Sequence, residues 1–371
     1  MLFPYTYVPH QMERMQIFID FIFYEVWCTA PVGLVFHTDL FEGNSDLKEV
    51  MVEFGFSPTA SARGKRFYKE VKEIYELFEP LSTQEINQFK QWYQGNNDLE
   101  KVCAKNPAAR LARYTDINAH HNQIGSQLAI FFKDLYSHSL LNLAVLRKKI
   151  GNINNHYNNF VKINDSDKCP FCGINDLFGQ YHSKREAYDH YLPKAIYPFN
   201  SINFKNLVPA CHSCNSSYKT SKDSAYKPRD PTMADQRRAV FYPYTETPYA
   251  IELEITFQHA DFANLKTTDI TINFGPTALA EKLETWKDVY GIDERYKAKF
   301  LGENDGKYWF TQVFDEWQED GRTPTDYLIT LARQTGNRPY AECNFLKKPF
   351  LDACQRMGLF DNLDIEQTNN L

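Results

Sequence analysis

Four cysteines in two closely spaced pairs are the most specific chemical feature of the sequence. Cys169 and Cys172 enclose Pro-Phe, and Cys211 and Cys214 enclose His-Ser. A two-residue gap lets both thiolates of one tight turn reach the same tetrahedral Zn²⁺ at about 2.3 Å. We therefore expect these four residues to form one structural zinc site. The alternative is two chance pairs of free thiols.

The segment between the two pairs carries residues suited to phosphodiester hydrolysis. It runs over 38 residues, longer than in a simple zinc ribbon, so further structure must be built inside it. A neutral histidine can take a proton from water at pH 7, which makes His190 the candidate general base. Carboxylate and amide oxygens suit Mg²⁺ or Mn²⁺, so we expect Asp189 and Asn215 to hold a catalytic divalent cation. A purely structural role is the alternative for His190.

The order of these residues resembles the HNH endonucleases, the ββα-metal family. The matching elements are the acidic residue before His190, Pro193 three residues after it, the Asn206-Leu-Val segment, and the Cys-x-x-Cys-Asn-x-x-x-Lys run that ends at Lys219. The resemblance covers about residues 165–230, under a fifth of the chain. The Leu-Pro-Lys that follows His190 looks like HNH proteins of bacterial anti-phage systems.

The resemblance implies a role for each matched position. His190 would be the family's first histidine, and Asn206 its middle asparagine, orienting the loop or ring of His190. Asn215 stands where other members carry histidine or asparagine. The chain departs from the family in the loop 195–205, which lacks a common glycine pair and carries Tyr197-Pro198-Phe199 instead.

Two lysines are candidates for contact with the substrate phosphate. Lys219 follows Asn215 by four residues, about one helical turn, and Lys194 follows the candidate base. A solvated helix residue is the alternative for Lys219. Residues 161–230 hold ten Lys/Arg against seven Asp/Glu, a local charge of +3 in a chain of net charge −6. A locally positive module in an acidic body fits a polyanionic substrate, although an ordinary mixed surface could have the same charge.

Composition excludes several broad classes of protein. With 43% hydrophobic and 24% charged residues, the chain of 371 residues has the composition of a globular protein. The net charge rules out a wholly basic nucleic-acid binder. The early apolar stretch 15–27 is interrupted by Asp20 and Glu25, so it is too short and too charged to span a bilayer. We expect a cytoplasmic protein, in which thiols stay reduced.

Hydrophobic spacing predicts an α+β protein in three parts. These are a mostly helical N-terminal region (1–160), an HNH nuclease module with its zinc site (161–235), and a mixed strand and helix region of unknown role (236–371). We expect strands at 32–41, 250–257 and 268–274. The asparagine-rich stretch 151–164 predicts a linker or a ragged helix end.

Together these features predict a metal-dependent endonuclease, and they favour DNA over RNA as its substrate. Such an enzyme in a cytoplasm needs restraint, so we expect a regulatory partner, such as a sensor or an ATPase subunit, and a role in antiviral defence. Two alternatives remain open at this stage. One is a zinc-ribbon module that binds nucleic acid without cleaving it, and the other is a structural subunit of a larger complex.

Overall fold

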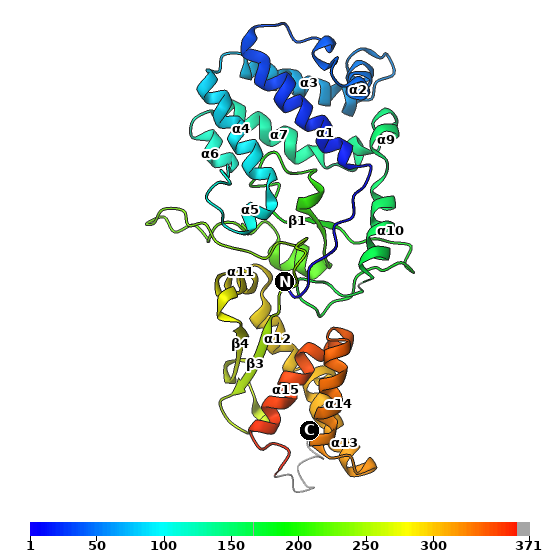
Figure 1. The fold of residues 1–371 in the computed structure, drawn as a ribbon, viewed down its shortest axis with the longest axis vertical. Helices are drawn as coiled ribbons and strands as arrows, with labels where there is room; N and C mark the ends of the chain where they lie inside the picture. The colour runs from blue at the N-terminus through cyan, green and yellow to red at the C-terminus, as the bar shows by residue number, and fades with distance from the viewer. Residues whose placement is uncertain (166, 362–371) are drawn as a thin grey trace. The chain divides into compact units, whose positions relative to one another are not determined.

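The computed structural model describes residues 1–165 and 167–361 and is an α+β fold (Figure 1). The chain forms two compact units. The larger comprises Pro4–Asp167 and Leu177–Thr247, and the smaller comprises Met1–Phe3, Lys168–Asp176 and the chain from Pro248 onward. This division differs from the three predicted parts. Most of the segment 161–235 belongs to the helical unit, whereas the turn that carries the first cysteine pair belongs to the C-terminal unit.

The larger unit is built mainly from helices, as the spacing of apolar residues predicts. Side chains that cap the first turn define several helix starts, and Ser82 with Glu85 forms the complete capping box of α4. The helices are α1 (Glu13–Phe21), α2 (Ser45–Phe56), α3 (Ala62–Phe78), α4 (Thr83–Asn97), α5 (Leu99–Cys103), α6 (Tyr114–Asn118), α7 (Asn122–Leu135), α8 (His138–Leu141), α9 (Ala144–Ile150) and α10 (Ile153–Asn164).

Two sequence predictions in this unit are wrong. Residues 32–41 form no strand. One 3-10 helix (Trp27–Val32) ends at the start of this segment, and another (Thr38–Phe41) occupies its end. The two valines there are exposed, Val32 by 75% and Val35 by 86%, so no neighbouring strand buries them. Residues 151–164 contain α10 because Asn152 caps its first turn and four residues at helical spacing (His156, Tyr157, Phe160 and Val161) are buried.

A short hairpin and a helical turn carry the candidate nuclease residues. Strand β1 (Tyr188–His190) pairs antiparallel with β2 (Leu207–Pro209), with Asp189 opposite Val208 and His190 opposite Leu207. A π-helical segment, η5 (Ser213–Lys219), follows β2 and contains Cys214, the last residue of the second cysteine pair.

The loop between the two strands is fixed to the helical core by an aromatic anchor. Phe199 is fully buried, and its ring contacts those of Phe23 and Phe132 with centroids 5.6 and 5.3 Å away. The end of α4 adds hydrogen bonds, because the Asn96 side chain donates to Pro198 O at 3.0 Å. These contacts hold the loop after His190 in place.

In its described part, the smaller unit joins a two-stranded sheet to α-helices. As predicted, strands fall at β3 (Glu252–Phe257) and β4 (Ile270–Gly275), which pair antiparallel. The helices are α11 (Ala280–Tyr290), α12 (Ile292–Phe300), α13 (Tyr308–Asp320), α14 (Pro324–Asn337) and α15 (Asn344–Arg356). Among the described residues, no helix has the length and apolar character needed to cross a membrane.

Helices α11 and α12 enclose the turn of the first cysteine pair within this unit. The Trp286 indole donates to Phe171 O at 2.6 Å, and the Tyr296 hydroxyl donates to Cys172 O at 2.9 Å. The Phe171 ring stacks on Tyr290 with centroids 4.7 Å apart. The C-terminal region, to which the sequence assigned no role, therefore buries this turn and satisfies its carbonyl groups.

Candidate functional site

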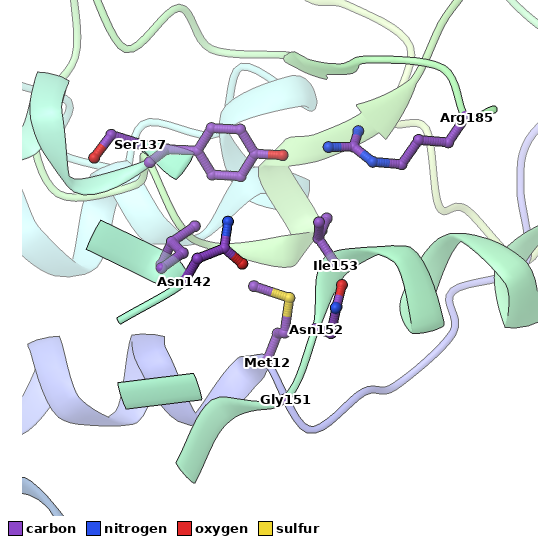
Figure 2. A pocket seen from close by; sticks show the side chains of 9 residues that line it. Met12, Ser137, Asn142, Gly151, Asn152, Ile153 and Arg185 are labelled. Atoms are coloured by element: carbon purple, nitrogen blue, oxygen red, sulfur yellow. The ribbon is translucent and has the colours of Figure 1, made fainter. Parts of the chain in front are cut away.

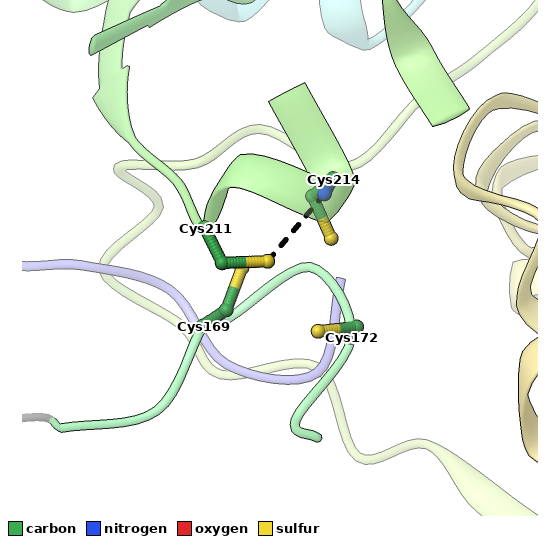
Figure 3. A group of neighbouring side chains, drawn as sticks. All are labelled: Cys169, Cys172, Cys211 and Cys214. Carbon is green, nitrogen blue, oxygen red and sulfur yellow. Dashed lines mark hydrogen bonds between the residues drawn. The ribbon is translucent and has the colours of Figure 1, made fainter. Parts of the chain in front are cut away.

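The four cysteines of the two pairs form one buried cluster (Figure 3). The Sγ atoms of Cys169, Cys172, Cys211 and Cys214 all lie within 4.8 Å of one another. Four sulfurs around one tetrahedral ion would be about 3.8 Å apart, given metal–sulfur bonds of about 2.3 Å. The backbone N–H of Cys214 donates to Cys211 Sγ at 3.4 Å, which would stabilise a thiolate there. The cluster could therefore bind a metal ion.

A glycine completes the turn of the first pair. Gly173 has φ +68°, and its N–H donates to Cys169 O at 2.7 Å. A Cβ at this position would lie 2.5 Å from Leu2 Cδ1 and 2.7 Å from the Phe345 ring. Both the left-handed backbone and the close packing require a residue without a side chain.

His190 is held with one ring nitrogen bonded to the backbone. Its Nε2 lies 2.9 Å from Ser201 O, and because a carbonyl can only accept, Nε2 carries the hydrogen. The lone pair is then on Nδ1. Burial, with smaller contributions from Lys194 and Lys219, lowers the pKa of His190 to about 3, so the ring is neutral at pH 7. At Nδ1 the ring can therefore accept a hydrogen bond.

Asp189 is completely buried beside Lys219. The Lys219 ammonium donates to Asp189 Oδ1 and to His190 O, each at 2.8 Å, and its side chain is 1% exposed. Lys219 therefore fixes the strand that carries Asp189 and His190 and does not face solvent or a phosphate, contrary to its predicted role in substrate binding. Burial raises the pKa of Asp189, while the neighbouring Lys219 lowers it.

The second oxygen of Asp189 is unsatisfied. Oδ2 is buried and has no hydrogen-bond partner within the described part of the chain. A buried carboxylate oxygen without a partner is unfavourable. A bound cation or a hydrogen-bond donor of a ligand could satisfy it.

Asn206 holds the loop that follows His190. Its Oδ1 accepts from Leu192 N at 2.7 Å, and its Nδ2 donates to Leu192 O at 3.1 Å and to Asn200 O at 3.2 Å. The side chain is fully buried. Of the two roles implied by the family resemblance, these contacts match orientation of the loop and not of the ring.

Lys194 lies in the loop between β1 and β2, and Asn215 lies after β2. Asn215 is half-buried in η5, one turn before Lys219, and no hydrogen bond of its side chain is found among the described residues. The Lys194 ammonium donates to Lys133 O at 3.0 Å, and burial lowers the pKa of Lys194.

Sequence reasoning missed the ring that packs against His190. Tyr136, at the end of α7, meets the His190 ring edge-on with centroids 4.9 Å apart. Tyr136 also lines a small pocket with Ser137, Asn142, Ile153 and Arg185 (Figure 2). No motif marks a tyrosine this far upstream in the chain.

Comparisons with known proteins give one partial similarity. A segment of 96 residues is 31% identical to the protein ea31 of Escherichia phage lambda, and it covers 26% of this chain and 28% of that protein. This chain thus matches little more than a quarter of the phage protein's length. No family model matches the chain, and no solved structure matches it significantly.

Proposed function

We propose that this chain is a metal-dependent endonuclease of the HNH type that hydrolyses phosphodiester bonds in DNA. The observation that carries the proposal is the arrangement around β1. A histidine whose Nε2 is bonded to Ser201 O, and which therefore carries its lone pair on Nδ1, stands next to a buried carboxylate. One oxygen of that carboxylate has no hydrogen-bond partner among the described residues.

In this proposal His190 takes the proton from the attacking water at Nδ1. The hydrogen bond from Nε2 to Ser201 O fixes the tautomer, and it would stabilise the imidazolium that forms. Asn206 keeps the loop in register, so that the ring cannot turn away from the water. A divalent cation bound by Asp189 and Asn215 would supply positive charge to the scissile phosphate and to the leaving oxygen.

The buried ion pair of Asp189 and Lys219 supports the cation site. Burial raises the pKa of Asp189, and Lys219 opposes that rise and so favours the ionised carboxylate. The ionised form could bind a cation through Oδ2. Zinc in the four-cysteine cluster would be structural, since four thiolates leave no open position for substrate or water.

A cellular role can be proposed from the need for restraint. An active nuclease would damage DNA in its own cytoplasm, so we expect a regulatory partner, such as a sensor or an ATPase subunit. An anti-phage effector fits this requirement and the Leu-Pro-Lys that follows His190. The alternative functions, a non-catalytic zinc ribbon that binds nucleic acid or a structural subunit, predict no cleavage at all.

The test is relaxation of a supercoiled plasmid by the zinc-loaded protein with and without added Mg²⁺ or Mn²⁺. We expect cleavage only with the divalent ion. Asp189→Asn combined with Lys219→Met removes the carboxylate without leaving a buried charge, and should abolish cleavage. Asn215→Ala should be milder and should recover at high Mn²⁺, because water can replace one neutral ligand. Full activity in the double variant would mean that Asp189 does not bind the catalytic ion.

A further inference from the structure

We propose that a groove between α10 and the segment before β1 binds the phosphodiester backbone of the DNA strand that enters the His190 site. This inference rests on the proposed function and adds the surface that positions the substrate. The groove, here called the α10 groove, is lined by Asn154, Asn158, His182, Ser183, Lys184, Arg185 and Ala187.

The groove has the size and chemistry of a polyanion site. Its volume is about 680 Å³. Its described lining residues include two permanent cations and one histidine, and none of them is acidic. The nearby Glu186 is not part of the lining, and its carboxylate accepts from Phe178 N at 3.2 Å. Asparagine and serine side chains add neutral donors, which commonly contact phosphate oxygens.

Arg185 is the residue that connects the groove to the candidate active site. Its Nε donates to Asn154 Oδ1 at 3.0 Å, and its Nη1 donates to Glu186 O at 3.0 Å. These two bonds leave further donors of the guanidinium for a ligand. Figure 2 shows this guanidinium directed into the small pocket that Arg185 shares with Tyr136. Tyr136 in turn contacts the His190 ring.

The groove and the base are also close together along the chain. Ala187 lines the groove, and the next three residues are β1, which ends at His190. Three strand residues span about 10 Å. A backbone bound along Lys184 and Arg185 would therefore place a neighbouring phosphate within reach of Asp189 and His190.

The experiment measures affinity for DNA as a function of salt concentration. The probes are a fluorescent 20-base-pair duplex and the single strand of the same sequence, used with the His190→Ala protein so that the probe stays intact. Lys184→Ala with Arg185→Ala removes the two cations of the groove. Lys65→Ala with Arg110→Ala is the matched control, because both residues are exposed and line neither pocket.

Each lost phosphate contact lowers the slope of log affinity against log salt by about 0.9 for duplex and about 0.7 for single-stranded DNA. For the variant with Lys184→Ala and Arg185→Ala, we expect the magnitude of the slope on duplex DNA to fall by about 1.8. The control variant should keep the original slope. Arg185→Lys should keep most of the slope because it retains the charge. If Arg185 only supports the fold, Arg185→Ala will lower the melting temperature without changing the slope, which would overturn the inference.

The outcome can be separated from that of the proposed function. If the protein cleaves DNA but the groove variant keeps the wild-type salt slope, the groove proposal is refuted and the nuclease proposal stands. If the groove variant has a reduced slope but the protein that retains His190 does not cleave DNA, the groove is a DNA-binding surface and the nuclease proposal is refuted. Absence of DNA binding at low salt would contradict the inference directly.

Discussion

Replacing Lys219 by methionine should destabilise the larger unit strongly. The Lys219 ammonium is 2.8 Å from Asp189 Oδ1, and the two side chains are 1% and 3% exposed. Removing one partner of such a pair leaves an uncompensated buried charge, which lowers the free energy of unfolding by about 3–5 kcal/mol. The loss should lie in the upper part of that range, because Asp189 Oδ2 already lacks a partner and His190 O loses one as well.

The assay is chemical and thermal unfolding of the zinc-loaded protein. For a unit of this size, 1 kcal/mol shifts the melting temperature by about 2–4 °C, so Lys219→Met should lower it by roughly 6–20 °C. Lys65→Met is the control, because it removes an exposed lysine from α3 and should change stability by less than about 0.5 kcal/mol.

A double-mutant cycle identifies the cause. Adding Asp189→Asn to Lys219→Met removes the stranded charge, so the double variant should be more stable than Lys219→Met alone. The reasoning is wrong if Lys219→Met unfolds like the wild type, or if the double variant is as unstable as the sum of the two single variants.

Three further predictions concern the metal cluster and the base. Purified protein that has not met a chelator should contain about one zinc per chain, and Cys211→Ser should lose that zinc and much of its stability, because metal binding contributes to folding. Gly173→Ala should lower the melting temperature, since its Cβ would overlap Leu2 and Phe345; unchanged stability would mean that the turn relaxes freely. His190 has a folded pKa of about 3, below its usual 6.5, so its contribution to stability is full above pH 6.5 and is lost as the pH falls toward 3. As the pH falls from about 7.5 to about 5, the unfolding free energy of the wild type should therefore drop by about 2 kcal/mol relative to that of His190→Gln. A difference that stays constant with pH would refute the shifted pKa.

The features that sequence predicts well here depend on local spacing. In each pair, two residues separate the cysteines, and this spacing is typical of one tight turn. The structure brings both pairs into one cluster. The strands at 252–257 and 270–275 follow from apolar residues that alternate with polar ones, and inward side chains such as Ile255 and Ile272 are buried.

The features that sequence misses depend on which distant segments surround a residue. Lys219 is spaced as a surface residue of a helix, yet it is buried because Asp189 lies on the neighbouring strand. Composition was also misleading at 151–164, where asparagines suggested a linker while four buried residues define a helical face. The contact of Tyr136 with His190 arises only from the packing of α7, which no local pattern encodes.

The measurement that tests the central claim most directly is plasmid cleavage by His190→Ala beside His120→Ala, an exposed histidine changed in the same way. A general base contributes about 10²–10⁴-fold to rate, so His190→Ala should lose at least about 100-fold in Mg²⁺, while His120→Ala keeps the wild-type rate. Both variants should retain their zinc and bind DNA. Cleavage by His190→Ala at the wild-type rate would contradict the assignment of His190 as the base, and with it the proposed nuclease site.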